Sequence, residues 1–320
     1  MKALVTGATG FIGSHLCEEL ARRGHTVTCL VREKSNLKWI ENIDLKIITG
    51  DCEKIESLYD AVDGVDYVFH LAGLTKACSE DEFFCANALG TENLIRAVVE
   101  KNPKLKRFIY MSSLAAVGPS KNGSPVKEEA DPSPVSNYGK SKLKGERTVL
   151  KYKESIPVTV LRPSAVYGPR DRDLFVFFKM LKKGIFPYWG KCYYSLLYVD
   201  DLIQGIILAA ENKKAEGEIY FLSDSEFYTN EEIMNAISSA LGTKAFRLRV
   251  PKCIMPLFAY IGEKINRQGI INRDKMSELS HSHWICDATK AKEELGFIPK
   301  VRIKEGMKWT ADWYRIHRWL

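Results

Sequence analysis

The chain has 320 residues, 45% hydrophobic and 27% charged, which is the composition of an ordinary globular protein with one large domain or two moderate ones. Its formal net charge is +7, but the basic residues are scattered, so we expect a solvated surface and no nucleic-acid partner. No apolar run approaches the roughly 20 residues that cross a bilayer, and Met1 leads directly into a predicted strand, which leaves no room for a signal peptide.

The first predicted strand, Lys2–Thr6, runs into a turn with three glycines, and the predicted helix Phe11–Arg23 follows. A pyrophosphate binds at such a strand-to-helix turn, where free backbone N–H groups and the positive end of the helix dipole face the anion. Gly7 permits the tight turn, Gly10 lets the backbone approach phosphate oxygens, and Gly13 lets the helix lie close to the sheet. A glycine-rich turn without a ligand is the alternative.

The second predicted strand, Thr26–Val31, ends where a NAD-binding sheet carries an acidic residue for the ribose 2′-hydroxyl. Here Val31 takes that place and Arg32 follows. Because a guanidinium can hold a 2′-phosphate with two hydrogen bonds, we predict NADP(H) as the preferred cofactor, with NAD(H) as the alternative. Two observations leave this open: Glu33 could reach the ribose, and Arg32 could be a solvated loop residue.

Apolar runs and helical patterns continue to alternate along the N-terminal half. Buried strands are predicted at Leu45–Thr49, Tyr67–Leu71, Phe108–Met111 and Val158–Leu161, and helices at Phe83–Val99 and Ser136–Tyr152. This alternation predicts an α/β fold with a Rossmann-like, doubly wound parallel sheet. The segment Lys121–Pro134 is rich in Pro, Ser, Gly and charge, and is expected to be a surface loop that could form a mobile flap.

The predicted chemistry lies in and before the helix Ser136–Tyr152. Tyr138 and Lys142 stand at i and i+4 on one face of this helix. A nearby ammonium stabilises a phenolate and lowers its pKa, so Tyr138 could exchange a proton with a carbonyl or alcohol oxygen. Ser113 follows the end of a predicted strand, where such a sheet opens into its ligand crevice, and could donate to the same oxygen. A surface pair at i and i+4 is the alternative.

Beyond about residue 165 the predicted strands become rarer, and helices such as Glu231–Leu241 and Ile303–Trp319 dominate. We therefore expect a smaller, mostly helical substrate-binding domain over residues 166–195 and 224–320. The dinucleotide-binding domain would span residues 1–165, with 196–223 returning to it through Val199–Ala210. An aromatic face on the last helix packs either on the chain's own core or on a second copy; it comprises Trp309, Trp313, Tyr314 and Trp319.

The pattern of cysteines indicates the cellular compartment to expect. None of the eight forms a Cys-x-x-Cys pair, and no His/Cys cluster has metal-ligand spacing, so no metal site is expected. Cys17, Cys29 and Cys85 fall inside apolar helix or strand patterns. We expect buried thiols in a reducing compartment and a cytoplasmic location.

Taken together, the motifs resemble those of the extended short-chain dehydrogenase/reductase family, also called the NAD-dependent epimerase/dehydratase family. The resemblance covers nearly the whole chain. It rests on Thr6–Gly13, Gly50-Asp51, His70–Gly73, Asn87–Leu94, Ser112-Ser113, Tyr138–Lys142, Leu161–Pro163, Tyr167–Arg170, Tyr198–Asp201 and Glu294–Phe297. Each motif is modest alone, but their order and spacing together are specific.

The resemblance implies roles for individual residues. Ser113, Tyr138 and Lys142 fall at the catalytic positions, and Asn87 would orient the neighbouring helix and loop. Asp51 and Cys52 would meet the adenine. The ribose and pyrophosphate would be lined by Leu71, Ala72 and Gly73, the nicotinamide ribose held by Tyr138 and Lys142, and the carboxamide contacted by Pro163, Ser164 and Val166. Thr9, Phe11, Ile12 and Ser35 complete the expected cofactor set, beside the glycines and Arg32.

The substrate is less clear from the residues. Nucleotide-sugar enzymes of this family commonly carry an asparagine where this chain has Ala165, an arginine where it reads Tyr193–Leu197, and a second arginine where it reads Glu278–Trp284. A diphosphate needs such cations, although Arg170, Arg172 and Arg273 could substitute. Together with the apolar runs described next, these departures make the chain look similar to the hydroxysteroid dehydrogenase and dihydroflavonol reductase branch, whose substrates are larger and lipophilic.

Three apolar runs could line a hydrophobic cleft or simply pack the core: Leu174–Phe178, Ile185–Trp189 and Ile254–Ile261, the last of which could also touch a membrane surface. The expected substrate residues are Thr75, Ser113, Leu114, Phe175, Phe178, Tyr188 and Trp189.

Three functions are thus open. The first is an NAD(P)-dependent oxidoreductase that moves hydride between nicotinamide and a carbonyl or secondary alcohol of a fairly large substrate. The second is a nucleotide-sugar epimerase or dehydratase that uses the same Ser-Tyr-Lys site, and the third is a binding or scaffold protein. A homodimer is expected, because the helices Asn87–Val99 and Tyr138–Leu150 form the dimer contact in many family members.

Overall fold

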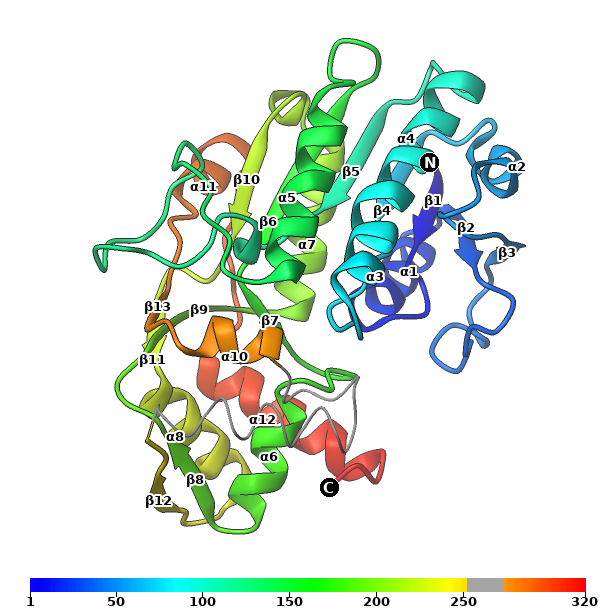
Figure 1. Ribbon diagram of the computed structural model, residues 1–320. Coiled ribbons are helices and arrows are strands. Elements are labelled where there is room, and N and C mark those ends of the chain that lie inside the picture. The colour runs from blue at the N-terminus through cyan, green and yellow to red at the C-terminus, as the bar shows by residue number, and fades with distance from the viewer. Residues whose placement is uncertain (252–272) are drawn as a thin grey trace.

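The computed structural model describes residues 1–251 and 273–320. Its main feature is a parallel sheet of seven strands in the order β10-β6-β5-β4-β1-β2-β3, with helices on both sides (Figure 1). The strands are β1 (Lys2–Thr6), β2 (Thr26–Val31), β3 (Lys46–Thr49), β4 (Tyr67–His70), β5 (Arg107–Met111), β6 (Val158–Pro163) and β10 (Ile219–Leu222). The predicted doubly wound fold is confirmed.

Each face of the sheet has its own core, because successive side chains of a strand point to opposite faces. In β1, Val5 packs on the side of α1 (Phe11–Arg22) and α7 (Val199–Glu211), whereas Leu4 packs on the opposite side. That opposite side is covered by α2 (Tyr59–Val62), α4 (Gly90–Lys101) and α5 (Asn137–Leu150). The order of strands reverses between β1 and β4, which is where a ligand crevice forms in such sheets.

Two predicted elements differ from the observed ones. β3 is a strand, but it lies at the sheet edge and three of its four residues are exposed, so its apolar run was misread as a buried strand. The helix expected at Phe83–Val99 is a continuous stretch of α3 (Glu80–Phe84), a π-helical turn (Cys85–Leu89) and α4. Cys85 is exposed at the start of this turn, which corrects its expected burial.

The part after residue 165 combines helices with short strands. The helices are α6 (Phe175–Lys182), α8 (Asn230–Leu241), α10 (Arg273–Leu279), α11 (Thr289–Leu295) and α12 (Ile303–Ile316). The short strands β7 (Ala165–Tyr167), β9 (Tyr193–Tyr198), β11 (Phe227–Thr229) and β13 (His283–Trp284) form one small sheet, and β8 (Ile185–Tyr188) pairs with β12 (Phe246–Arg249) in another. These short strands were not predicted from the sequence.

Figure 1 shows α6, α8 and α12 grouped together below the large sheet, with α10 between this group and α5. The last helix, α12, packs on α6 through Tyr314, which is fully buried against Phe178, whereas Trp313 and Trp319 contact Trp39 in the segment after β2. Trp309 is the most exposed of the four aromatic residues. The apolar run Ile254–Ile261 lies outside the described residues.

The segment 121–134 is a loop without helix or strand, as expected, but it is tied to the rest of the chain. Val126 exchanges backbone hydrogen bonds with the chain at Ile285 and Asp287, and the Glu128 carboxylate accepts the N–H of Phe221 at 2.9 Å. None of the helices in the described residues is long and apolar enough to span a membrane.

Candidate active site

Both the backbone conformation and the close packing of the turn between β1 and α1 require glycine there. Gly7 has φ +72°, and a Cβ there would lie 2.7 Å from the N of Ala72. A Cβ on Gly13 would lie 2.1 Å from the carbonyl oxygen of Gly7, so the helix approaches the turn as closely as backbone permits. The N–H of Gly10 donates to Gly7 O at 3.0 Å, which closes the turn below the N-terminus of α1. This cradle suits a diphosphate.

A cavity of about 270 Å³ opens over this turn at the carboxyl edge of the sheet. Ten of the expected cofactor residues line it: Gly7, Thr9, Gly10, Arg32, Ser35, Asp51, Cys52, Leu71, Ala72 and Gly73. Seven further residues line it that were not expected to bind the cofactor, which are Thr6, Leu30, Val31, Gly50, Glu53, Leu74 and Ala86. Except for Ala86 in the π-helical turn, they lie at or shortly after the ends of β1, β2, β3 and β4, so the topology of the sheet brings them together.

A buried hydrogen-bond chain shapes the loop after β4. His70 lies between Thr6 and Thr91, with Nδ1 2.7 Å from Thr6 Oγ1 and Nε2 2.9 Å from Thr91 Oγ1. Since Thr91 donates to Asn87 O and Thr6 accepts from Ala72 N, the consistent arrangement is Nε2–H donating and Nδ1 accepting. Burial lowers the pKa of His70 to about 3, so the imidazole is neutral and the loop position of Ala72 does not change near neutral pH.

Asn87 fixes the next part of the same loop. Its Oδ1 accepts the N–H of Leu74 at 2.7 Å, and its Nδ2 donates to Leu74 O and to Ser141 Oγ, both at 2.9 Å. Ser141 donates in turn to the carbonyl of Tyr138. Asn87 therefore connects the cavity wall to the helix that carries the predicted proton donor.

Ser113, Tyr138 and Lys142 come together at the mouth of the crevice. Ser113 caps the short helix Leu114–Ala116, and its side chain hydrogen-bonds the Tyr138 phenol. Lys142 is 4% exposed; its Nζ lies over the Tyr110 ring, 4.5 Å from the centroid, and a Cβ on Gly73 would be 3.7 Å from it. The ammonium thus reaches the wall of the dinucleotide cavity.

The charges around Tyr138 differ from the expectation. Burial raises the pKa of Tyr138 to about 12, and the hydrogen bond from Ser113 opposes this rise. Glu278 also raises the pKa of Tyr138 and Lys275 lowers it. Burial lowers the pKa of Lys142 itself to about 7, so it carries only part of a charge near neutral pH. The effect of Lys142 on the phenol stays a prediction.

Behind Lys142 lies a buried ion pair that joins α5 to the sheet. Arg162 on β6 donates to both carboxylate oxygens of Glu146 at 2.9 and 2.7 Å, and the two side chains are 3% and 1% exposed. Ser112, next to Ser113, donates to the same carboxylate at 2.5 Å. Glu146 also raises the pKa of Lys142, against the larger effect of burial. The ends of strands β5 and β6 are thereby held to α5, the helix that carries Tyr138 and Lys142.

Several of the remaining expected cofactor residues do not line the cavity over the glycine turn. Phe11 and Ile12 are partly buried at the start of α1 and do not line it, and Pro163 is buried at the end of β6. Ser164 is buried, and its hydroxyl is one of the described polar groups without a hydrogen-bond partner. Such an unsatisfied hydroxyl suits a ligand amide. Val166 lines a second cavity, next to Tyr138.

A second cavity, of about 310 Å³, adjoins Tyr138. Its apolar wall comes from β7, α6, β9, α8 and α10 and from residues next to α6 and β8. It comprises Ala165, Val166, Tyr167, Leu174, Phe177, Trp189, Tyr194, Leu196, Ile233, Met234 and Leu279. Its polar lining residues are Thr75, Lys76, Tyr138, Asp171, Asp173, Asn230, Asp274, Lys275 and Glu278. Two expected substrate residues, Thr75 and Trp189, line it; α10 supplies groups that no local sequence signal could have shown.

Other expected substrate residues lie elsewhere. Phe178 is fully buried against Tyr314, so it packs the core and cannot meet a substrate, because α6 turns Phe177 rather than Phe178 toward the cavity. Phe175 packs on Trp319, and Tyr188 lies under the guanidinium of Arg247. Leu114 packs with Phe221 and Cys286 in a separate small cluster. None of these four lines the cavity.

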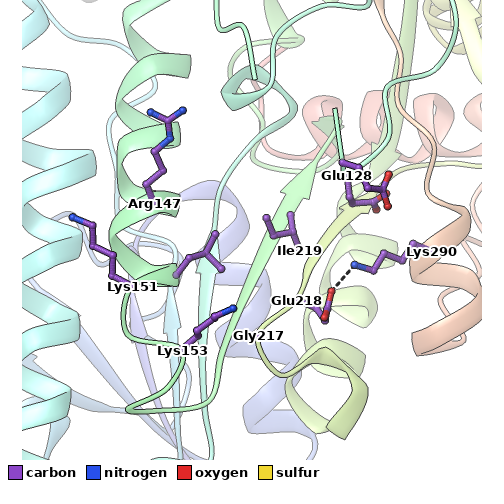
Figure 2. Close-up of a pocket in the computed structure, with 10 residues that line it drawn as sticks. Glu128, Arg147, Lys151, Lys153, Gly217, Glu218, Ile219 and Lys290 are labelled. Atoms are coloured by element: carbon purple, nitrogen blue, oxygen red, sulfur yellow. Dashed lines mark hydrogen bonds and ion pairs between the residues drawn. The ribbon is translucent and has the colours of Figure 1, made fainter. Parts of the chain in front are cut away.

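Another hollow lies away from this chemistry, at the edge strand β10 (Figure 2). Its charges are mixed: Lys290 pairs with Glu218 at 2.6 Å, and Arg147 and Lys151 lie across from Glu128. None of the residues expected in the active site lines it. No group of three His, Cys, Asp or Glu side chains within residues 1–251 and 273–320 is arranged to hold a metal ion.

A dinucleotide cavity beside a Ser-Tyr-Lys set, at the carboxyl edge of a doubly wound sheet, defines an NAD-dependent oxidoreductase-type enzyme of the extended short-chain dehydrogenase/reductase kind. A model of the NAD dependent epimerase/dehydratase family matches residues 3–222, which is more than half of the chain. The chain belongs to this family.

Named relatives include both reductases and epimerases. The 2-alkyl-3-oxoalkanoate reductase of Shewanella oneidensis is 28% identical over 96% of this chain and 84% of the relative. The ceramide reductase of Caulobacter vibrioides is 28% identical over 99% and 95%. A solved UDP-glucuronic acid 4-epimerase variant from Bacillus cereus, in complex with a UDP-sugar and NAD, has a TM-score of 0.81 and 25% identity over 99% of this chain and all of that one.

Proposed function

We propose that this chain is an NADP(H)-dependent oxidoreductase that moves hydride between nicotinamide and a carbonyl or secondary alcohol of a neutral, partly apolar substrate. The charge of the substrate cavity is the observation that favours this oxidoreductase over a nucleotide-sugar epimerase. Four carboxyl groups and two ammonium groups line it, and the described lining residues include no arginine. The ammonium groups are already paired, Lys76 with Asp173 and Lys275 with Glu278, so a diphosphate would meet net negative charge.

The chain's own residues would hold and protonate the substrate. The glycine turn and the residues lining the first cavity would bind the dinucleotide, which supplies or accepts hydride when bound. Ser113, already bonded to Tyr138, would donate to the reacting oxygen and orient it toward the phenol. Tyr138 would give its proton to that oxygen in reduction and take it back in oxidation. Lys142, at the wall between the cavities, would bind the nicotinamide ribose.

The test is turnover. A panel of neutral ketones with apolar bodies should consume NADPH with the wild-type protein, measured by nicotinamide absorbance, and Tyr138→Phe should lose at least about 100-fold of that rate. Tyr59→Phe, whose hydroxyl bonds Glu100 on the surface, is the matched control and should retain the wild-type rate. A UDP-sugar that is converted without net change in absorbance would instead establish the epimerase, the function named for several relatives.

The preference for NADP(H) is part of this proposal. Arg32 is exposed at the end of β2, its N–H donates to Ser35 Oγ at 3.0 Å, and both residues line the dinucleotide cavity. A guanidinium and a hydroxyl there suit a 2′-phosphate. NADPH should bind more tightly than NADH in fluorescence titrations, and Arg32→Ser should weaken NADPH about tenfold while leaving NADH unchanged. Tighter binding of NADH to the wild-type protein would overturn the preference.

Two further proposals concern the setting of the enzyme. The seven described cysteines form no disulfide, which supports a reducing compartment, the cytoplasm. The outer faces of α4 and α5 support a homodimer: Glu92 is exposed on α4, and Lys140, Lys144 and Arg147 are exposed on α5. When two copies meet around a two-fold axis, these opposite charges can face each other.

A further inference from the structure

The N-terminus of the catalytic helix α5 is covered by α10, a helix far away in the sequence. The carboxylate of Asp274 accepts the backbone N–H groups of Asn137 and Tyr138 at 2.6 and 3.2 Å. The hydroxyl of Ser136, the N-cap of α5, donates to Glu278 at 2.8 Å. A carboxylate at this end of a helix satisfies open N–H groups and the helix dipole, so α10 is docked in a defined orientation.

This docking brings two opposite charges into the substrate cavity next to Tyr138. Lys275 and Glu278 lie one helical turn apart on α10, with Nζ 2.8 Å from the Glu278 carboxylate, and both line the cavity that Tyr138 lines. The Lys275 side chain is 44% exposed and Glu278 is 12% exposed, so the ammonium is the more accessible of the pair. Lys142, by contrast, is directed to the Tyr110 ring and Gly73.

We propose that Lys275 is a positioning residue of this active site: α10 holds its ammonium beside the Tyr138 phenol, where it favours the phenolate, and Glu278 opposes it. This rests on the proposed function of Tyr138 as proton donor and acceptor. Lys275 lowers the pKa of Tyr138 and Glu278 raises it. The Lys275–Glu278 pair also bears on the class of substrate. Because the Lys275 ammonium is already paired, it suits a substrate with a neutral oxygen near the reacting carbon.

Other groups face Tyr138 and must be kept constant. Ser113 bonds the phenol, Asp173 with its partner Lys76 lies across the cavity, and Tyr110 and Lys142 lie behind it. Asp274 holds the backbone of Tyr138, and the Phe83 ring contacts the phenol ring with centroids 6.2 Å apart. None of these groups is replaced in the variants below.

The experiment compares Lys275→Met and Glu278→Gln, with Lys275→Arg to retain the charge. The control is Lys140→Met, which removes an exposed ammonium from α5. The ionisation of Tyr138 is followed by NMR of ¹³Cζ-labelled tyrosine, with Tyr138→Phe to assign its signal, up to the highest pH at which each variant keeps its circular dichroism. With a ketone or alcohol from the panel, the pH profile of kcat/KM for alcohol oxidation is a second readout.

Lys275→Met should raise the apparent pKa of Tyr138 by roughly 0.5–1 unit, and Glu278→Gln should lower it by a similar amount. Lys275→Arg and Lys140→Met should match the wild type. Shifts of opposite sign cannot come from a general loss of structure. The proposal is overturned if Lys275→Met leaves the Tyr138 signal unmoved, or if both variants shift it in one direction. The NMR readout needs no turnover, so an active Tyr138→Phe would refute the proposed function alone.

Discussion

Gly13 has no room for even a methyl group, because an added Cβ would lie 2.1 Å from a backbone oxygen of Gly7. Gly13→Ala must push α1 away from the turn, which should cost about 1–3 kcal/mol of the free energy of unfolding and abolish dinucleotide binding. Urea denaturation and a fluorescence titration with NADPH measure the two effects.

The control is Gly64→Ala, another glycine at positive φ but with nothing within 4 Å of an added Cβ. It should lose some stability through backbone strain while binding dinucleotide normally. Equal loss of binding in both variants would contradict the steric explanation.

The buried Lys142 makes stability depend on pH. Burial lowers the pKa of Lys142 in the folded chain to about 7, against an ordinary value near 10.5, so between these values the unfolded chain holds a proton that the folded chain releases. Stability contributed by this residue is therefore lowest at and below pH 7 and rises as pH increases toward 10.5.

Lys142→Met should consequently stabilise the ligand-free protein at neutral pH by more than about 1 kcal/mol, although it removes a residue of the proposed active site. Urea denaturation at several pH values should show this advantage shrinking as pH rises. An advantage that is constant with pH would mean that packing, and not ionisation, distinguishes the two side chains.

At the level of elements, the Glu146–Arg162 pair connects α5 to β6 without contact with water. Removing one partner leaves a buried charge, so Glu146→Ala should cost about 3–5 kcal/mol of the free energy of unfolding. The double variant Glu146→Leu with Arg162→Met should recover much of this loss, because an apolar pair has no charge to desolvate.

Lys106→Ala is the matched control. It breaks the pair with Asp66, in which the lysine side chain is 62% exposed, and should cost less than about 1 kcal/mol. If both single variants lose the same stability in urea denaturation, burial is not what makes the Glu146–Arg162 pair important.

The strongest elements could be predicted from sequence because their signals are local. Runs such as Thr26–Val31 are mostly apolar and β-branched, and the glycine turn has a strand on one side and a helix on the other. β3 was misjudged because an edge strand and a central strand can carry similar apolar residues. Short strands such as β13 exist only because β9 lies beside them, so no local pattern could reveal them.

At the scale of the whole molecule, the proposed homodimer can be tested through its charges. Lys144→Glu combined with Arg147→Glu places acidic groups on the outer face of α5, where they would oppose Glu92 of the second copy. We expect the dimer to dissociate in sedimentation velocity experiments, and adding Glu92→Lys to restore it. The pair Lys182→Glu and Lys183→Glu, exposed beside α6, is the control and should leave the sedimentation coefficient unchanged.

The two cavities were predictable to different degrees. The dinucleotide cavity follows consecutive strand ends of one sheet, so motifs at those ends name most of its lining. The substrate cavity collects side chains from α5, α6, β9, α8 and α10, which are separated by long stretches of chain. Which face of α6 points inward depends on how α6 packs on α8 and α12, and for that reason Phe178 was chosen where Phe177 lines the wall.

The π-helical turn Cys85–Leu89 has a consequence for how this enzyme can change over time. A π turn accommodates one residue more than an α turn, and each residue rotates a helix by about 100°. Deleting a single residue there would leave an unbroken helix but swing Phe83 away from Tyr138, whose rings now lie 6.2 Å apart. A one-residue length change in this turn, which also carries Ala86 of the dinucleotide cavity, could therefore reshape the surroundings of the Tyr138 phenol.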